Sequence, residues 1–473
     1  MVPPQQQVLS MPECLSMIFM YLDRHSLTLA ARVCHRWEHP AVKELWKDLP
    51  SPFPLLKLLG PMINDRLGWK FTGNIQRPDW DHWSNHTRPV RSLCIDDRES
   101  NLRIHQDALL QLQPEFSAWG WTQLLPRLTF LQLNIQAKSM FPFTRLVTSS
   151  LKTLLITVTI GMVGPDLRLS MTNAFLELRE MATVMKLHTF HIIVPGRQSV
   201  DLTRALIAFV CSQPSLRSLK LYLGLEAYPI REALTNITSL KTLLIHAKRP
   251  EPAECREILD LIQLCPDLEE LFVVEDIFRY WNHIKFPSFS LPRSWLGCHG
   301  LKMLKCRAVD LATLTPEIVQ EMGEAWPHME ILHLFNNRKH NEPEGIAPWF
   351  LHSFAAAFSA TLLNLGVTID FTLTATESRN PPTASRFTKL ETLHVSNSII
   401  EPQNMQPFAE LLSACTGSRG VHVVCDRITL QGLYERYWRL NIMVADLCPN
   451  GGLGAERDIE EMRPDCFEEY WST

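Results

Sequence analysis

The feature that most constrains this chain is a short apolar pattern that recurs along most of its length. Each copy has an apolar residue, two variable residues, a leucine or phenylalanine, one variable residue and another apolar residue. Copies begin at Leu128, Leu151, Leu187, Leu216, Leu240, Leu268, Leu301, Met329, Leu362 and Leu390. Successive copies start 23 to 36 residues apart, with helical stretches such as 316–325 between them. Such self-similarity predicts a repeat array in which strand-plus-helix units stack on one another.

This unit resembles the long, irregular leucine-rich repeat. We therefore predict an α/β fold in which residues 89–425 form a leucine-rich-repeat solenoid, with an earlier copy at Val90 and a weaker one around Val421. The regular family pattern places Asn or Cys three residues after the third apolar position. Only the Met329 copy has it, as Asn337, so we expect no regular Asn ladder. A plain α/β sheet fold is the alternative.

A short amphipathic helix is predicted near the N-terminus. Pro12 and Glu13 suit its first turn, because proline needs no N–H there and an acid favours the helix dipole. The spacing i, i+3, i+4, i+7 places one apolar stripe on this helix: Leu15, Ile18, Phe19 and Leu22. Ser26 is predicted to cap a second helix, and Pro40 to begin a third. So small a module must bury its stripe against the rest of the chain or a partner.

The order of these residues resembles the F-box family. The matching steps are Pro12–Glu13, Ile18–Phe19, Ser26–Leu27 and the run from Val33 to Trp37, while Cys14 departs from the usual Ile or Leu. The resemblance, closest to fungal F-box/leucine-rich-repeat proteins, implies an F-box at residues 9–49 that docks on the Skp adaptor of SCF cullin-RING ubiquitin ligases. By matched position it assigns adaptor binding to Pro12, Leu15, Ile18, Phe19, Leu22, Leu27 and Val33. A helical hairpin that merely caps the repeats is the alternative.

The remaining segments are assigned by composition. Residues 1–8 form a polar tail, and residues 50–88 form a connector rich in Pro and Trp that we expect to be packed. Residues 426–473 are predicted to contain a capping helix over the last repeat and then an acidic tail.

Strand alternation predicts where a protein substrate binds. The residue between the second and third apolar positions should point away from the core, onto the concave face. We assign substrate binding on this face to Leu155, His191, Lys220, Leu244, Phe272, Lys305 and His333. The position after the first apolar residue is basic in the early copies and mostly acidic later, which suits a protein segment of complementary charge. Alternatively, these side chains are simply solvated.

Charge and composition exclude several classes of partner. The net charge is -4, which argues against nucleic acid or an anionic membrane as the main partner. No signal peptide or membrane-spanning apolar run is recognisable. The 12 cysteines include no Cys-x-x-Cys pair, which indicates reduced thiols and a cytoplasmic and/or nuclear location.

The sequence offers no catalytic motif. It contains no Gly-x-Ser-x-Gly, P-loop or His-Glu-x-x-His segment, and we predict no catalytic residue, no metal site and no cofactor. The predicted function is therefore that of a substrate receptor, which holds a bound protein for ubiquitin transfer while other ligase subunits supply the catalysis. A non-ligase interaction scaffold with an F-box-like helical cap is the alternative.

Overall fold

The computed structural model describes residues 11–65, 68–73, 75, 77–96, 104, 108, 124–135, 143–158, 165–194, 199–222, 227–246, 260–274, 290–306, 309–335, 345–373, 386–395, 398, 400–417, 421–424, 440, 441, 443, 444 and 447. The chain divides into two compact units. The first unit is Met1–Leu225 with Thr235–Ser239, and the second is Glu226–Leu234 with Leu240–Thr473.

The first unit begins with the helices α2 (Pro12–Phe19), α3 (Arg24–Ala30) and α4 (His35–Lys47). Two predicted helix starts are corrected. Asp23, not Ser26, caps α3, because its carboxylate accepts the backbone N–H of Ser26 at 2.7 Å. The third helix begins at His35 and continues through Pro40, whose fixed φ is compatible with a helix although its missing N–H costs one hydrogen bond.

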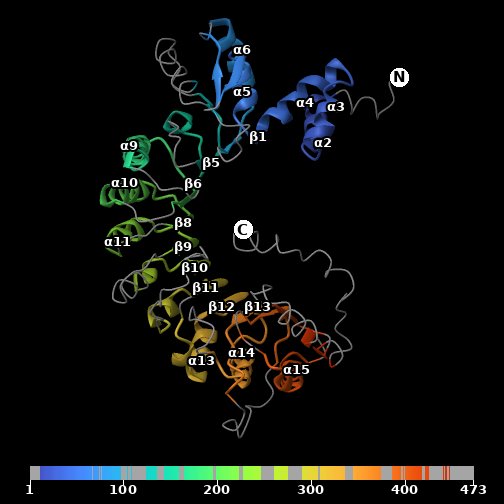
Figure 1. Ribbon diagram of the computed structural model, residues 1–473, viewed down its shortest axis with the longest axis vertical. Helices are drawn as coiled ribbons and strands as arrows, with labels where there is room; N and C mark the ends of the chain where they lie inside the picture. Colours follow the sequence, from blue (N-terminus) through green and yellow to red (C-terminus); the bar gives the residue numbers. More distant parts are fainter. Residues whose placement is uncertain are drawn as a thin grey trace. The chain divides into compact units, whose positions relative to one another are not determined.

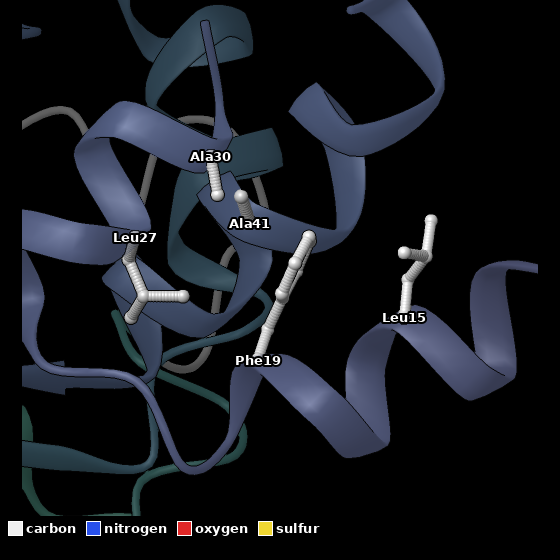
Figure 2. Packing of buried hydrophobic residues seen from close by; sticks show 5 residues of the cluster. All are labelled: Leu15, Phe19, Leu27, Ala30 and Ala41. Carbon is white, nitrogen blue, oxygen red and sulfur yellow. The ribbon is translucent and has the colours of Figure 1, made fainter. Parts of the chain in front are cut away.

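These three helices share a small core of their own. Leu15 and Phe19 from α2 pack with Leu27 and Ala30 from α3 and Ala41 from α4, and all five are buried. Figure 2 shows the Phe19 ring pointing from α2 toward the other helices. The ring of Trp37 meets Phe19 edge-on, with 5.5 Å between centroids.

The third helix leads directly into a sheet. Strand β1 (Asp48–Leu49) follows α4 and pairs in parallel with β4 (Ser92–Asp96). Between them lie α5 (Phe53–Lys57), the antiparallel pair β2 (Met62–Asp65) and β3 (Gly68–Phe71), and α6 (Arg77–Thr87). The ring of Trp46 on α4 packs edge-on against His86 on α6 at 5.0 Å, so α6 is held against the third helix.

The other strands of the first unit are β5 (Phe130–Ile135), β6 (Thr153–Val158), β7 (Thr189–Ile193) and β8 (Ser218–Tyr222). They lie in the order β1-β4-β5-β6-β7-β8, and every neighbouring pair is parallel. The intervening helices are η1 (Phe143–Leu146), α9 (Pro165–Met181) and α10 (Val200–Cys211). Helices α9 and α10 lie side by side next to these strands (Figure 1).

The chain passes through α11 (Ala227–Asn236) into the second unit, which repeats the same plan. Its strands, in spatial as in chain order, are β9 (Thr242–His246), β10 (Glu270–Val274), β11 (Met303–Cys306), β12 (Ile331–Leu334), β13 (Asn364–Val367), β14 (Thr392–His394) and β15 (His422–Val424). Its helices are η2 (Leu261–Leu264), η3 (Arg293–Gly297), η4 (Leu311–Thr313), α13 (Pro316–Ala325), η5 (Pro348–Phe350), α14 (Leu351–Ala357) and α15 (Pro402–Thr416). All pairings between β9 and β15 are parallel.

The predicted fold class is confirmed: a helical N-terminal segment precedes parallel strands and helices arranged as leucine-rich repeats. The second apolar position of each copy lies on a strand, and equivalent residues pair, so that Leu131 is opposite Leu154 and Leu304 is opposite Leu332. The three apolar positions are buried in nearly every copy, with Val273 half-buried as an exception. Asn337 and the predicted capping helix around 433–438 lie outside the described residues.

Within each unit, a backbone hydrogen-bond ladder runs along the start of the strands. In the first unit, Lys152 donates its N–H to the carbonyl of Thr129, and His188 donates to Lys152, each at 2.8 Å. In the second unit, Lys302 donates to Glu269 and Glu330 donates to Lys302, again at 2.8 Å. The ladder fixes the side chains that follow the first apolar position in one column.

Candidate protein-docking surfaces

The structure divides the residues assigned to adaptor binding into two groups. Leu15, Phe19 and Leu27 are buried in the helical core, and Leu22 is half-buried against it. Pro12, Ile18 and Val33 are exposed, the last two with exposed fractions of 43% and 61%. The exposed group and the accessible part of Leu22 can contact a partner without unfolding the module. Leu15, Phe19 and Leu27 can act there only by holding the helices in place.

Four further apolar side chains are exposed on the same helical segment, and sequence reasoning did not assign them. They are Met17, Met20, Tyr21 and Leu29, and Tyr21 is 85% exposed. For Met17, Met20 and Tyr21, the sequence signal is the near-continuous apolar run from Met17 to Leu22, which is too wide for one helical stripe. We refer to these four side chains, together with Ile18 and Val33, as the apolar face of the helical segment.

A cavity of about 430 Å³ lies where the three helices meet the first strands. Phe19, Leu22 and Leu27 line it from the helices, and Phe130 and Gln132 line it from β5. Arg24 also lines this cavity, and its guanidinium donates to the carbonyl oxygens of Asp48 at 2.5 Å and Leu45 at 3.3 Å. The cavity combines apolar walls with polar groups and contains no arrangement typical of catalysis.

In the first unit, the residues assigned to substrate binding lie along the sheet face. Leu155, His191 and Lys220 occupy equivalent, paired positions on β6, β7 and β8, and all are half-buried. His191 makes a 3.1 Å hydrogen bond to the Ser218 hydroxyl. Burial and then the nearby Lys220 lower the pKa of His191 to about 3, so its ring is neutral at physiological pH.

In the second unit, the expectation of solvent-facing side chains is corrected for three of the four assigned residues. Phe272 is half-buried, but Leu244, Lys305 and His333 are exposed by only 3%, 8% and 1%. The reason is contact between neighbouring strands. The Lys305 Nζ lies 5.7 Å from the Phe272 ring centroid, and the His333 Nε2 lies 2.9 Å from the Asn364 Oδ1.

The column at the start of the strands differs in charge between the units. In the second unit, the Glu269 carboxylate lies between Lys241 and Lys302, hydrogen bonding to both, with a distance of 2.9 Å to Lys302. These hydrogen bonds lower the pKa of Glu269 to about 2. In the first unit, His188 occupies the equivalent place between Lys152 and Arg217, and desolvation followed by these two cations lowers its pKa.

One cysteine–histidine contact has the appearance of a catalytic pair. The Cys415 Sγ lies 3.5 Å from the His352 Nδ1. Burial raises the pKa of the Cys415 thiol to about 12, so it holds no nucleophilic thiolate at neutral pH. Within the described ranges, no group of three or more His, Cys, Asp or Glu side chains could hold a metal ion, and no helix is long and apolar enough to cross a membrane.

Comparison with known proteins agrees with this geometry at the N-terminus. The F-box-like family matches residues 12–49, which confirms the predicted F-box. A search of curated proteins found no match.

Similar solved structures include three with a TM-score of 0.36. The leucine-rich repeat-containing protein LegL7 from Legionella pneumophila is 11% identical, with 68% of this chain and 99% of that chain covered. An internalin (inlF) from Listeria monocytogenes is 12% identical, with coverages of 76% and 85%. The Rad7 and Elc1 complex from yeast gives 13% identity and coverages of 91% and 92%.

Proposed function

We propose that this protein is the substrate-recognition subunit of an SCF-type ubiquitin ligase, acting in the cytoplasm and/or nucleus. The main support for this proposal is the exposure of the apolar face of the F-box-like segment. Its members Ile18, Tyr21 and Val33 are 43%, 85% and 61% exposed although the module already has a core of its own. Several large apolar side chains left exposed on so small a module indicate an interaction surface.

The energetics favour a partner on this face. Full burial of one large apolar side chain contributes about 1.5–3 kcal/mol. Six such side chains are available: Met17, Ile18, Met20, Tyr21, Leu29 and Val33. The F-box match at residues 12–49 supports the Skp adaptor, and through it a cullin-RING ligase, as the partner.

In this proposal the repeats bind a protein substrate and perform no chemistry. The side chains available on the sheet faces are Leu155, His191 and Lys220 in the first unit and Phe272 in the second, all half-buried. The chain acts by holding its substrate, and the ligase partners supply the ubiquitin transfer. No cofactor is required for that role.

Binding to purified Skp adaptor, measured by calorimetry with the full chain, tests the proposal. The variant Ile18→Asp with Tyr21→Asp should lose binding, because both side chains are exposed on α2 and in the turn that follows it. The matched control is Leu169→Asp with Val184→Asp, two residues of the first unit outside the F-box that are 62% and 59% exposed. Equal thermal stability of the variants confirms that only the surface has changed.

A non-ligase scaffold remains the second candidate, and one observation favours it. The F-box resemblance assigns Leu15, Phe19 and Leu27 to docking, but all three are buried in the module's own core. If the folded, unmodified chain does not bind the adaptor, the ligase proposal is wrong, and the apolar face belongs to another protein partner.

A further inference from the structure

We propose that the first unit carries a binding site for an acidic peptide segment at the edge where its strands begin. This inference deepens the proposed function, since it names the chemical class of substrate that the repeats would recognise. The site is a cationic band formed by Arg88, Arg91, Arg127, Lys152, Lys186 and Arg217.

The band is free of acidic residues in sequence. The five segments that enter β4 to β8 are 88–92, 126–130, 149–153, 185–189 and 214–218, and they contain no Asp or Glu. The corresponding segments of the second unit are mixed, with Asp267, Glu269, Glu330 and Glu391 among their cations. The two units thus share one backbone plan, but the segments that enter their strands differ in charge.

No ion pair within the described part of the chain neutralises the band. Arg88, Arg127, Lys186 and Arg217 are exposed, and Lys152 is half-buried. The Arg91 guanidinium donates to the carbonyl oxygens of Arg88 and Arg127, at 3.2 and 3.5 Å, which leaves its charge unneutralised. Among the described residues, none of the band's cations pairs with a carboxylate.

The second unit shows what a carboxylate does at this position. There Glu269 lies between Lys241 and Lys302 and hydrogen bonds to both. In the first unit the same column runs Lys152, His188, Arg217, with the N–H of each donating to the carbonyl of the one before at 2.8 Å. A partner's carboxylate bound over His188 would lie between Lys152 and Arg217, as the Glu269 carboxylate lies between Lys241 and Lys302. Desolvation lowers the pKa of His188 most, and the positive charges of Lys152 and Arg217 on its two sides lower it further.

The length of the band matches a short peptide segment. Neighbouring strands lie about 4.8 Å apart, so β4 to β8 span about 19 Å. An extended peptide advances about 3.3 Å per residue, so about six residues cross the band. A nucleic acid fits less well, because the band lacks an exposed aromatic side chain for base stacking and the whole chain carries a net charge of -4.

Fluorescence anisotropy with the full-length chain tests this assignment. The probe is a fluorescein-labelled peptide of alternating Glu and Ser, and its neutral counterpart alternates Gln and Ser. The Glu peptide should bind, and added salt should weaken it. The reversal Lys152→Glu with Arg217→Glu should reduce affinity by about tenfold or more, because two attractions become repulsions.

Two further variants separate the band from general charge and from folding. Arg179→Glu with Arg204→Glu makes the same charge change on exposed positions of α9 and α10 and should leave affinity unchanged. His188→Glu supplies an internal carboxylate between Lys152 and Arg217, so it should abolish peptide binding while the chain stays as stable as the parent.

Several results would overturn the proposal. They are equal binding of the Gln peptide, an equal loss in the Arg179 and Arg204 control, or preferential binding of an oligothymidylate of the same charge. Binding that appears only after truncation before Glu456 would assign the band to the chain's own acidic tail instead. The assay contains no adaptor, and the Ile18→Asp with Tyr21→Asp variant should bind the Glu peptide normally, so a failed ligase proposal would not be mistaken for a failed peptide site.

Discussion

The backbone N–H of Arg91 donates a hydrogen bond to the carbonyl oxygen of Lys47 at 2.8 Å. Lys47 is the last residue of α4, and Arg91 immediately precedes β4. Thr129 makes the same bond to Arg91, and Lys152 makes it to Thr129, so the F-box provides the first step of the ladder in this unit. The third F-box helix is therefore joined to the repeats through the sheet itself.

Substitution of Leu49 should loosen this junction. Leu49 is 3% exposed on β1 and pairs with Leu93, at the position that later copies give to a core leucine. We expect Leu49→Ala to lower the free energy of unfolding by about 2–5 kcal/mol, because it leaves a cavity in the core. Urea denaturation measures the loss, and hydrogen exchange at the Arg91 amide reports the junction directly.

The control for this substitution is Leu29→Ala, since Leu29 is 50% exposed on α3. A surface change of this kind should stay within about 0.5 kcal/mol. If both variants unfold at the same urea concentration, β1 does not contribute to the repeat core.

The F-box shows how far periodicity can predict a site. The spacing of Leu15, Ile18, Phe19 and Leu22 located the first helix, because an apolar stripe must be buried somewhere. It could not separate core from docking face, since that depends on Ala41, which packs against the stripe from a helix further along the chain. Ile18 and Phe19 are adjacent in sequence, yet one is exposed and the other buried.

In the strand columns, too, periodicity predicted the core but not which of the other side chains are buried. Alternation placed the repeated leucines in the core, because side chains on a strand point alternately to opposite faces. It did not predict that Lys305 and His333 would be buried on the other face. Their burial depends on cross-strand neighbours such as Phe272, Asn364 and Gly366, and strand pairing brings these together from distant parts of the sequence.

Gly366 should not tolerate a side chain. The His333 ring lies over it, and a Cβ built there would be 2.7 Å from the His333 Cδ2 and 2.6 Å from the Phe335 Cζ. We expect Gly366→Ala to cost about 1–3 kcal/mol of the free energy of unfolding through overpacking. Denaturant unfolding measures this cost.

Gly297 in the same unit provides the comparison, because a Cβ there would meet nothing within 4 Å. Gly297→Ala should therefore leave stability nearly unchanged. Equal stability of the two alanine variants would show that the His333 and Phe335 rings can move aside without loss.

The bridge at Glu269 should make stability depend on pH. Hydrogen bonds from Lys241 and Lys302 lower the folded-state pKa of Glu269 from 4.5 to about 2. A lowered pKa means that the stabilisation is complete above pH 4.5 and is lost as the pH falls through about 2. The stability difference between the parent and Glu269→Gln should therefore be largest above pH 4.5 and should shrink toward pH 2.

Glu391→Gln controls for loss of a carboxylate at the same repeat position, because Glu391 has no ion pair within the part of the chain that the structure describes. Added salt should reduce the Glu269 effect, since its bridge is partly exposed to solvent. A Glu269→Gln difference that stays constant from neutral pH to pH 2 would contradict the bridge.

Thiol reactivity should distinguish an inert chain from a cysteine-dependent enzyme. Burial raises the pKa values of Cys265, Cys298 and Cys415 to about 12, 11 and 12, whereas Cys34 is exposed. Iodoacetamide at mildly alkaline pH should therefore label Cys34 in the folded chain and reach the three buried thiols only after denaturation. Peptide mapping by mass spectrometry identifies the labelled sites. Rapid labelling of Cys415 in the folded chain, lost in His352→Ala, would instead show that this contact activates the thiol as a nucleophile.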